Sequence, residues 1–298
     1  MKYSVKDIED IIYKYLPKEE GYPVTVLTAM NYGFMAGGKR LRPMMMKLCY
    51  DMFIDKDYRD ADKIISPFMA AIEMIHTYSL IHDDLPALDN DELRRGKPTV
   101  HAKFGEDIGI LAGDGLLNYA YETAAKAFSE KPGSVEIEKA YTILASKPGI
   151  YGMIGGQVLD VIMSGKEVDE KQLEYIYLNK TSALIECAFM IGAYLGGASK
   201  EDVDTLCMVA RNVGMAFQVQ DDILDIIGDE AVLGKPVLSD DKNNKFTYVT
   251  IHGMDSAKDY VSSASKEAVS MLDTLKVKNE KAKSEMKDLI LALINRDK

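Results

Sequence analysis

The chain has 298 residues, of which 47% are hydrophobic, so it is long enough to bury a large core. Its formal net charge of −11 argues against general affinity for nucleic acid or for an anionic membrane surface. Cys49, Cys187 and Cys207 are far apart and odd in number, which argues against a disulfide framework or a zinc site. We expect these thiols to be buried and reduced in a cytosol.

Targeting segments are the next class that the sequence argues against. The charged, amphipathic N-terminus has no apolar signal core, and the longest uncharged apolar stretch, residues 187–198, is too short to span a bilayer. We therefore expect a cytoplasmic protein without a membrane anchor.

Helical periodicity dominates the chain. Apolar residues recur at helical spacing in rows such as Ile64, Phe68, Ala71, Ile75 and Tyr78. Glycine and proline breakers divide the chain into about ten to a dozen helices. These breakers include Gly21, Gly37, Gly38, Pro67, Pro86, Gly96, Gly133, Gly165, Gly196, Gly197 and Gly234. The pattern predicts one all-α domain over residues 1–298 that ends in two charged helices over residues 255–296.

A basic turn precedes one of the early helices. Lys39, Arg40 and Arg42 lie just before or within a first turn that Pro43 is suited to open. Cations at a helix N-terminus repel the helix dipole, but together with that dipole they make a strong anion site.

An acidic cluster follows the apolar segment 68–82. Asp83 and Asp84 come directly before Pro86, where a helix should end or distort because proline has no backbone N–H. Negative charge at a helix C-terminus is unfavourable unless a cation is bound. Asp83 and Asp89 therefore suggest a Mg²⁺ site with carboxylate and phosphate oxygens, although a solvated acidic loop is the simpler alternative.

Two arginines and a histidine accompany this cluster. Arg94 and Arg95 either neutralise the neighbouring acids or clamp a diphosphate, whose oxygens match guanidinium forks. His76 lies seven residues before Asp83 and so on the same helix face. It is either a satisfied core histidine or a hydrogen-bond donor to phosphate.

A second acidic cluster lies late in the chain. Asp221 and Asp225 are four residues apart on one helix face, Gln218 lies one turn earlier, and Asp222 points about 100° away. A polar stripe on an otherwise apolar helix indicates a metal or a binding partner, since buried charge needs compensation. An exposed helix face is the alternative.

Taken together and in order, these segments resemble the bacterial farnesyl diphosphate synthase family of trans-prenyltransferases over about residues 33–250. The matching segments are GGKRLRP (37–43), HTYSLIHDDLPALDNDELRRGKPT (76–99), GMIGGQVLD (152–160), NKTSALI (179–185), FQVQDDILD (217–225) and GDEAVLGKP (228–236). The resemblance implies the isoprenoid synthase fold, in which helices surround a deep central cavity, and a homodimer.

The resemblance also implies roles for individual residues. Mg²⁺ ligands, for three ions with substrate bound, are expected at Asp83, Asp84, Asp89 and Asp221, the last supported by Asp225. The isopentenyl diphosphate site is expected at Lys39, Arg42, His76 and Arg95. The allylic diphosphate site is expected at Arg94, Lys180, Thr181, Gln218 and Lys235, of which Lys180, Thr181 and Gln218 are also the expected catalytic residues.

Close helix packing is the expected role of Gly152, Gly155 and Gly156, with Gln157 and Asp160 as support. Ser182 departs from the family pattern, because a glycine is common after the Lys-Thr pair.

Product length is expected to depend on the residues below the first acidic cluster. In resembling enzymes an aromatic residue at the position of Tyr78 closes the pocket near fifteen carbons. Helix arithmetic instead places small Ser79 on the Asp83 face, which leaves Tyr78 as a plain core residue in the alternative.

Three other functions remain open. A geranylgeranyl diphosphate synthase would have the same site and a deeper pocket. A terpene cyclase would use an acidic Mg²⁺ motif but would not need the basic turn. An inactive partner subunit is disfavoured by two intact acidic clusters.

Overall fold

The computed structural model describes residues 3–55, 61–227 and 246–294, and almost every ordered element in these ranges is a helix. The chain forms two compact units. Among the described residues, the N-terminal unit contains 3–47 and 61–137, and the C-terminal unit contains 48–55, 138–227 and 246–294. The all-α fold class is therefore confirmed, whereas one domain over the whole chain stays a prediction.

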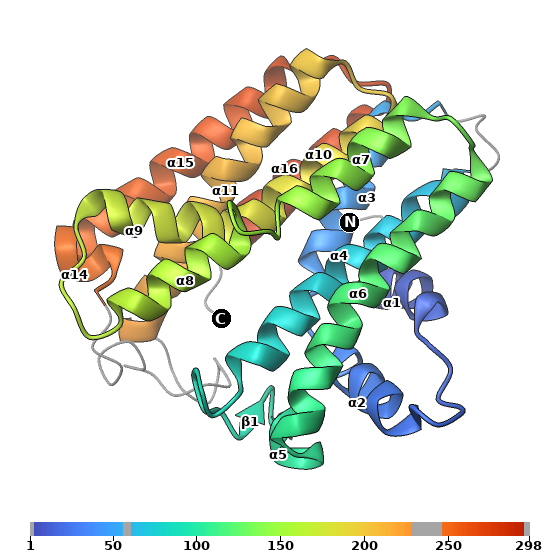
Figure 1. The fold of residues 1–298 in the computed structure, drawn as a ribbon. Helices are drawn as coiled ribbons and strands as arrows, with labels where there is room; N and C mark the ends of the chain where they lie inside the picture. Colours follow the sequence, from blue (N-terminus) through green and yellow to red (C-terminus); the bar gives the residue numbers. More distant parts are fainter. Residues whose placement is uncertain (1–2, 56–60, 228–245, 295–298) are drawn as a thin grey trace. The chain divides into compact units, whose positions relative to one another are not determined.

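The N-terminal unit is built from helices and one small hairpin (Figure 1). Its elements are α1 (Val5–Ile12), the 3-10 helix η1 (Tyr13–Tyr15), α2 (Val24–Phe34), the start of α3 (Leu41–Phe53), α4 (Ala61–Asp83), β1 (Leu93–Arg94), β2 (Lys97–Pro98), α5 (Val100–Phe104), α6 (Glu106–Glu130) and the start of α7 (Val135–Ser146).

The longest packing interface in this unit joins α4 to α6, which run side by side in Figure 1. Missing side chains let them approach closely: a β-carbon on Gly113 of α6 would lie 2.1 Å from Nε2 of His82. His82 bonds the carbonyl of Ile110 at 3.1 Å across the same interface. The last turn of α4, which carries Asp83, is thus fixed against α6.

Two prolines had different effects on α4. The helix ends at Asp83, three residues before Pro86, as its missing N–H predicts. The expectation that Pro67 is a break is wrong, because α4 continues through it. Buried apolar residues on either side, such as Ile65 and Phe68, bury enough surface to outweigh the lost backbone bond.

One helix among the described residues, Asp62–Asp83, is long and apolar enough to cross a bilayer by length and composition. Its most apolar window is 83% buried inside the protein. The core helix of a globular protein passes the same test, so this is weak support for a span.

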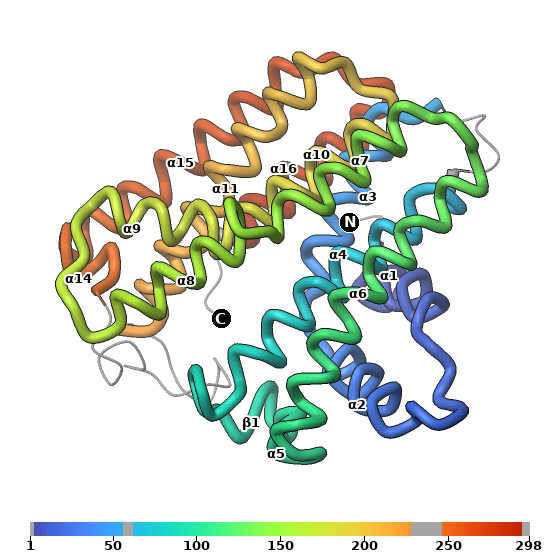
Figure 2. The backbone as a smooth tube through the Cα atoms, in the orientation of Figure 1, coloured from blue at the N-terminus to red at the C-terminus, as the bar shows by residue number. Residues whose placement is uncertain are grey.

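The C-terminal unit is entirely helical over its described residues. Its elements are the end of α3, the end of α7, α8 (Met153–Met163), α9 (Glu170–Ile176), the π-helix η2 (Tyr177–Ser182), α10 (Ala183–Gly196), α11 (Lys200–Ile227), α14 (Tyr248–His252), α15 (Met254–Thr274) and α16 (Glu280–Ile294). Figure 2 traces α11 alongside α15, its most extensive contact. The two expected C-terminal helices are α15 and α16.

Two glycines allow neighbouring helices of this unit to pack closely against η2. A β-carbon on Gly156 of α8 would lie 2.2 Å from the backbone nitrogen of Lys180, and one on Gly214 of α11 would lie 2.3 Å from Oγ of Ser182. Close packing, the role expected of the 152–156 glycines, is thus confirmed at Gly156. Ser182 fits at this position because Gly214 supplies the space, and its hydroxyl donates to the carbonyl of Tyr177 at 3.1 Å.

A buried carboxylate joins three helices of the same unit. Glu186 of α10 is 3% exposed, pairs with Lys147 just after α7, and bonds Nε of Arg211 on α11 at 3.1 Å. The cysteines are free as expected, with Cys49 and Cys187 buried and Cys207 partly so. Burial raises the pKa of each thiol, so none is activated as a nucleophile.

Candidate active site

The acidic turn after α4 brings two carboxylates together. The backbone N–H of Asp89 donates to the carbonyl of Asp83 at 2.8 Å, so the chain folds back past Pro86 onto the helix end. Asp83 is half-buried and Asp89 is exposed. This backbone bond brings the main chain of Asp89 back to that of Asp83.

Asp84 has a different environment from its neighbour. It is 3% exposed, and Arg94 grips both of its oxygens with bonds of 2.5 to 3.0 Å. Burial raises the pKa of Asp84, and the Arg94 hydrogen bonds offset only part of that shift. Arg94 and Asp84 therefore form an internal ion pair.

A pocket beside this ion pair is lined with cationic and imidazole groups. His76, Arg94 and Arg95 line it together with Arg40 and Glu73. The hairpin turn that presents Arg95 has positive φ at Arg95 and Gly96. A β-carbon on Gly38 would lie 2.7 Å from the guanidinium of Arg95, which donates to the carbonyl of Gly37.

Arg40 is a structural residue rather than an anion ligand. It is 3% exposed, and its guanidinium bonds Glu73 at 2.8 Å, Glu9 at 3.1 Å and the carbonyl of Phe34 at 2.8 Å. Because its hydrogen bonds are satisfied within the protein, Arg40 stabilises the basic turn. Lys39 and Arg42 are then the residues of this turn that could bind an anion.

Arg42 has a buried nitrogen, Nε, that makes no hydrogen bond to any of the described atoms. Burial lowers the pKa of Arg42, opposed by the charge of Glu73. Burial, together with Arg42 and Arg95, holds the pKa of His76 well below its ordinary value, so this imidazole is neutral at pH 7. This group of cations would be stabilised by an anion such as diphosphate.

The remaining predicted residues of the N-terminal unit are placed as follows. Lys39 is exposed on the basic turn. Tyr78 is 6% exposed, and its ring meets that of His82 edge-on with centroids 5.7 Å apart. Burial and the neighbouring Tyr121 of α6 raise the pKa of Tyr78 to about 12. Ser79 is half-buried, and its hydroxyl donates to the carbonyl of His76 at 2.9 Å.

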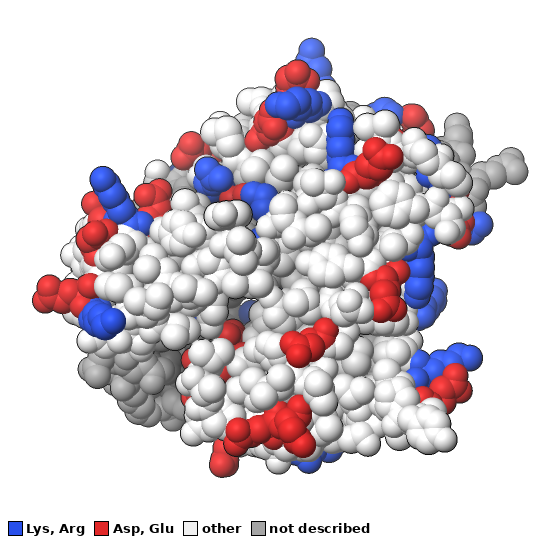
Figure 3. Space-filling view, viewed as in Figure 1, with Lys and Arg blue, Asp and Glu red and all other residues white. Residues whose placement is uncertain are grey.

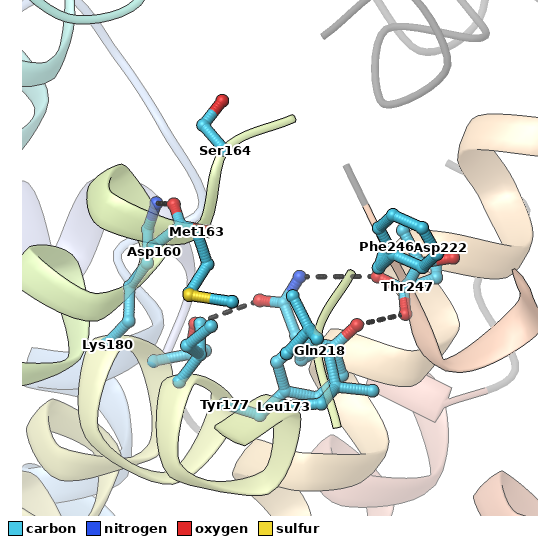
Figure 4. A pocket seen from close by; sticks show the side chains of 13 residues that line it. Asp160, Met163, Ser164, Leu173, Tyr177, Lys180, Gln218, Asp222, Phe246 and Thr247 are labelled. Carbon is cyan, nitrogen blue, oxygen red and sulfur yellow. Dashed lines mark hydrogen bonds and ion pairs between the residues drawn. The ribbon is translucent and has the colours of Figure 1, made fainter. Parts of the chain in front are cut away.

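A second pocket lies within the C-terminal unit, where η2, α8 and α11 meet (Figure 4). Lys180 pairs with Asp160 of α8 at 2.6 Å, and the hydroxyl of Thr181 donates to Oε1 of Gln218 at 2.8 Å. Apolar side chains complete the wall, among them Met163, Val168, Leu173, Ile176 and Phe246. A few polar groups in an apolar wall are typical of a small-molecule site.

The aspartates of α11 divide by burial. Asp221 is half-buried, whereas Asp222 is 3% and Asp225 is 2% exposed. Asp222 lines the pocket and accepts hydrogen bonds from the Tyr177 hydroxyl and, at 3.0 Å, from the backbone N–H of Tyr248. Lys235 lies outside the described residues.

Tyr177, Asp222 and Tyr248 are the site residues that sequence analysis did not single out as functional. Helix geometry placed Asp222 about 100° away from the face that carries Asp221 and Asp225. Tyr177, three residues before Lys180, belongs to no sequence pattern that would indicate a functional role. Tyr177 is the first residue of the π-helical turn η2, from which its hydroxyl reaches Asp222. The apolar periodicity of the sequence does not reveal a π turn.

The comparisons with known proteins show the family of this chain. The family model described as "Polyprenyl synthetase" matches residues 23–292. This chain belongs to the polyprenyl synthetase family. It is therefore a prenyltransferase, as the sequence resemblance predicted.

Relatives and solved structures cover most of the chain. A "Farnesyl diphosphate synthase" of Geobacillus stearothermophilus is 44% identical over 253 residues, which cover 85% of this chain and 83% of the relative. A "Geranylgeranyl diphosphate synthase" of Cyanophora paradoxa is 40% identical, over 86% and 83%. The structure of a Helicobacter pylori geranyltransferase "complexed with magnesium and isoprenyl diphosphate" is 31% identical, with a TM-score of 0.85 over 96% and 93%.

Mg²⁺ is the cofactor of this family, and the oxygen donors of this chain fit it. Within the described ranges no three His, Cys, Asp or Glu side chains already form a metal cluster. Mg²⁺ commonly binds through one or two carboxylates plus substrate phosphates.

Proposed function

We propose that this prenyltransferase is a farnesyl diphosphate synthase. It condenses dimethylallyl diphosphate, and then geranyl diphosphate, head-to-tail with isopentenyl diphosphate and releases diphosphate each time. The observation that carries the proposal is a cationic cradle formed by Arg42, Arg95 and the neutral His76 in a prenyltransferase of net charge −11. Nε of Arg42 is buried there without a hydrogen-bond partner among the described atoms. Bacterial farnesyl diphosphate synthases at about 40% identity support it.

The cradle and the pocket bind different substrates. Lys39, Arg42, His76 and Arg95 hold the diphosphate of isopentenyl diphosphate, and the neutral imidazole donates one hydrogen bond. Arg94 and Lys180 hold the allylic diphosphate, with Lys235 as a further cation outside the described residues. Because Arg94 is paired with Asp84 and Lys180 with Asp160, each exchanges a carboxylate for phosphate oxygens when substrate binds.

The metal residues of the proposal are Asp83, Asp89 and Asp221, with Asp84 once Arg94 has left it, and three ions bind with the substrate. Mg²⁺ neutralises the diphosphate and makes it a better leaving group. The acceptor-only carboxylates hold the ions, and the buried Asp225 supports the same helix face.

The reaction needs no protein nucleophile. The allylic carbon–oxygen bond breaks with its electron pair leaving on diphosphate, and the isopentenyl double bond attacks the resulting cation. A proton then leaves the new chain for the departed diphosphate. Oxygen atoms of Thr181 and Gln218 supply preorganised dipoles beside the cation, and the apolar wall excludes water that would quench it.

Tyr78 stops growth near fifteen carbons in this proposal. The ring is buried and packs edge-on against His82, so it adds bulk a little more than one turn before Asp83 on α4. Half-buried Ser79 is the smaller neighbouring residue that we assign to chain-length control beside Tyr78. The geranylgeranyl diphosphate synthases among the relatives make a twenty-carbon product the second candidate.

The protein acts as a cytoplasmic homodimer in this proposal. An apolar row at and before α8 supports a partner copy, since a patch of this kind usually marks an interface. The row contains Ile150, Tyr151, Ile154, Val158, Val161 and Ile162, all exposed. Figure 3 shows that the viewed face over α8 carries few charged side chains. Light scattering of the purified chain tests this.

The decisive experiment is a product assay. Purified chain is incubated with isopentenyl and dimethylallyl diphosphates, with and without Mg²⁺, and the products are separated by chain length. A Mg²⁺-dependent fifteen-carbon diphosphate supports the proposal, and a twenty-carbon product selects the second candidate. Turnover of farnesyl diphosphate alone to a hydrocarbon would indicate a cyclase, and no turnover would indicate an inactive subunit.

A further inference from the structure

A continuous line of hydrogen bonds runs through the pocket of the C-terminal unit. Thr181 donates to Oε1 of Gln218 at 2.8 Å, and Nε2 of Gln218 faces Oδ1 of Asp222 at 3.5 Å. Tyr177 and the backbone of Tyr248 donate to Oδ2 of the same carboxylate. Figure 4 shows Gln218 between the pocket interior and Asp222.

The chemistry of Asp222 fixes the direction of every bond in this line. Both oxygens of Asp222 act as acceptors, and the amide nitrogen of Gln218 is the atom that faces Oδ1. The amide is planar, so its carbonyl oxygen then faces Thr181. That oxygen accepts the Thr181 hydroxyl, whose lone pairs are left pointing away from Gln218. An amide at position 222 could instead present its nitrogen to Gln218, and the preferred orientation of the Gln218 amide would then be reversed.

Burial makes this control effective. Asp222 is 3% exposed, and Tyr177 and Tyr248 anchor its second oxygen from η2 and from the first residue of α14. The carboxylate therefore cannot turn away from Gln218 without losing two donors. In a low-dielectric pocket, such oriented dipoles act more strongly than in water.

We propose that Asp222 is a positioning residue that orients the Gln218 amide, so that the Thr181 and Gln218 oxygens present negative dipole ends to the allylic cation. This inference rests on the proposed function. It gives Asp222 a task distinct from the metal role proposed for Asp221, although the two residues are adjacent.

Asp222→Asn tests the orientation with a side chain of the same shape. The substituted side chain keeps its oxygen on the Tyr177 and Tyr248 donors, so its NH₂ group faces Gln218 and turns that amide over. The expected result is a kcat about 10²-fold lower, with the KM for isopentenyl diphosphate and the half-saturating Mg²⁺ concentration within about threefold of wild type. An unchanged kcat overturns the proposal, and so does a matched rise in the half-saturating Mg²⁺ concentration.

Restoring the polarity should restore the rate. In the double variant Asp222→Asn with Gln218→Glu, the new carboxylate accepts from both the substituted amide and Thr181. We expect kcat to recover at least about tenfold relative to Asp222→Asn, a coupling that only interacting residues show. Failure to recover overturns the proposal. Glu186→Gln is the matched control, because it neutralises another buried carboxylate of this unit away from the pocket, and its kcat should stay within about twofold.

A neutron structure of the unaltered protein gives a second test that needs no variant. Deuterons of the Gln218 amide on the Asp222 side support the proposal, and deuterons on the Thr181 side overturn it. This measurement also separates the two proposals. If the wild-type chain has no prenyltransferase turnover, the proposed function fails, while the amide orientation is still read directly.

Discussion

The two acidic motifs of this protein look alike in sequence but are built differently. In both, the first aspartate of the pair, Asp83 or Asp221, is half-buried, and the second, Asp84 or Asp222, is 3% exposed. Asp84 is held by the guanidinium of Arg94, whereas the hydrogen bonds described for Asp222 come from neutral donors. In each pair the first carboxylate is the more accessible one, and the second is buried and held by hydrogen bonds within the protein.

The largest effect is expected from replacing the first aspartate of each pair. Asp83→Ala and Asp221→Ala should each lower kcat by at least about 10³-fold, equivalent to about 4 kcal/mol of transition-state stabilisation, because each removes a proposed Mg²⁺ ligand. Steady-state assays with both diphosphates measure this. The exposed residues Asp91 and Asp204, changed to Asn, are the controls. Near-normal turnover in either alanine variant would remove that motif from the metal site.

A second prediction separates rate from product length. Thr181→Val in the C-terminal unit should lower kcat about 10²-fold without changing the product, because it deletes one preorganised oxygen. Tyr78→Ala in the N-terminal unit should lengthen the product while most of the rate remains. Chromatography of the products reads both. Tyr78→Phe keeps the ring and should keep the fifteen-carbon product; a longer product from that variant would contradict the role of bulk.

The third prediction compares how the two buried aspartates are compensated. Arg94→Ala leaves a buried carboxylate unpaired and should lower the free energy of unfolding by roughly 2–4 kcal/mol. Tyr177→Phe removes one neutral donor of Asp222 and should cost about 1.5 kcal/mol. Urea unfolding without Mg²⁺ or substrate measures both.

The control for this comparison removes the stranded charge. Adding Asp84→Asn to Arg94→Ala should recover part of the lost stability, because the buried charge is then gone. Equal losses in the two single variants would show that the two carboxylates are compensated alike.

The smallest expected effect is a pH dependence in the cationic cradle. The pKa of His76 is depressed in the folded protein, so between its folded value and about 6.5 the unfolded chain binds one more proton. Stability should therefore fall on acidification through that window, by at most about 1.4 kcal/mol per pH unit. His76→Gln should reduce the loss seen between pH 7.5 and pH 5.5 in urea unfolding. An identical loss in both proteins would contradict the depressed pKa.

Sequence reasoning predicted the helical fold class because periodicity and breakers are local signals. The end of α4 before Pro86 and the opening of α3 near Pro43 followed from proline chemistry. It could not tell which cation of the basic turn is structural, because Arg40 is defined by Glu9 and Glu73, which are distant in sequence. Pro67 was misjudged for the same reason: packing of the surrounding helix outweighed a local rule.

The candidate site was predicted as a set of residue types but not as a hydrogen-bond pattern. The resemblance named Lys180, Thr181 and Gln218, and the structure places all three in one pocket. It gave no indication that Arg94 binds Asp84 bidentately or that Tyr177 reaches Asp222, since both pairs depend on tertiary contacts. Direct metal and substrate roles of these residues remain predictions for the assays above.

The π-helical turn η2 has a consequence for the helical phase of this region. A π turn accommodates one residue more than an α turn, and the surplus shifts the angular register of everything downstream by about 100°. Deleting a single residue within Tyr177–Ser182 would let α9 and α10 join as one regular helix, and it would rotate the apolar stripe of α10 away from α11. The number of residues in η2 therefore sets the orientation of both the pocket side chains and the buried face of α10. For this reason a one-residue insertion or deletion here should be more damaging than most substitutions.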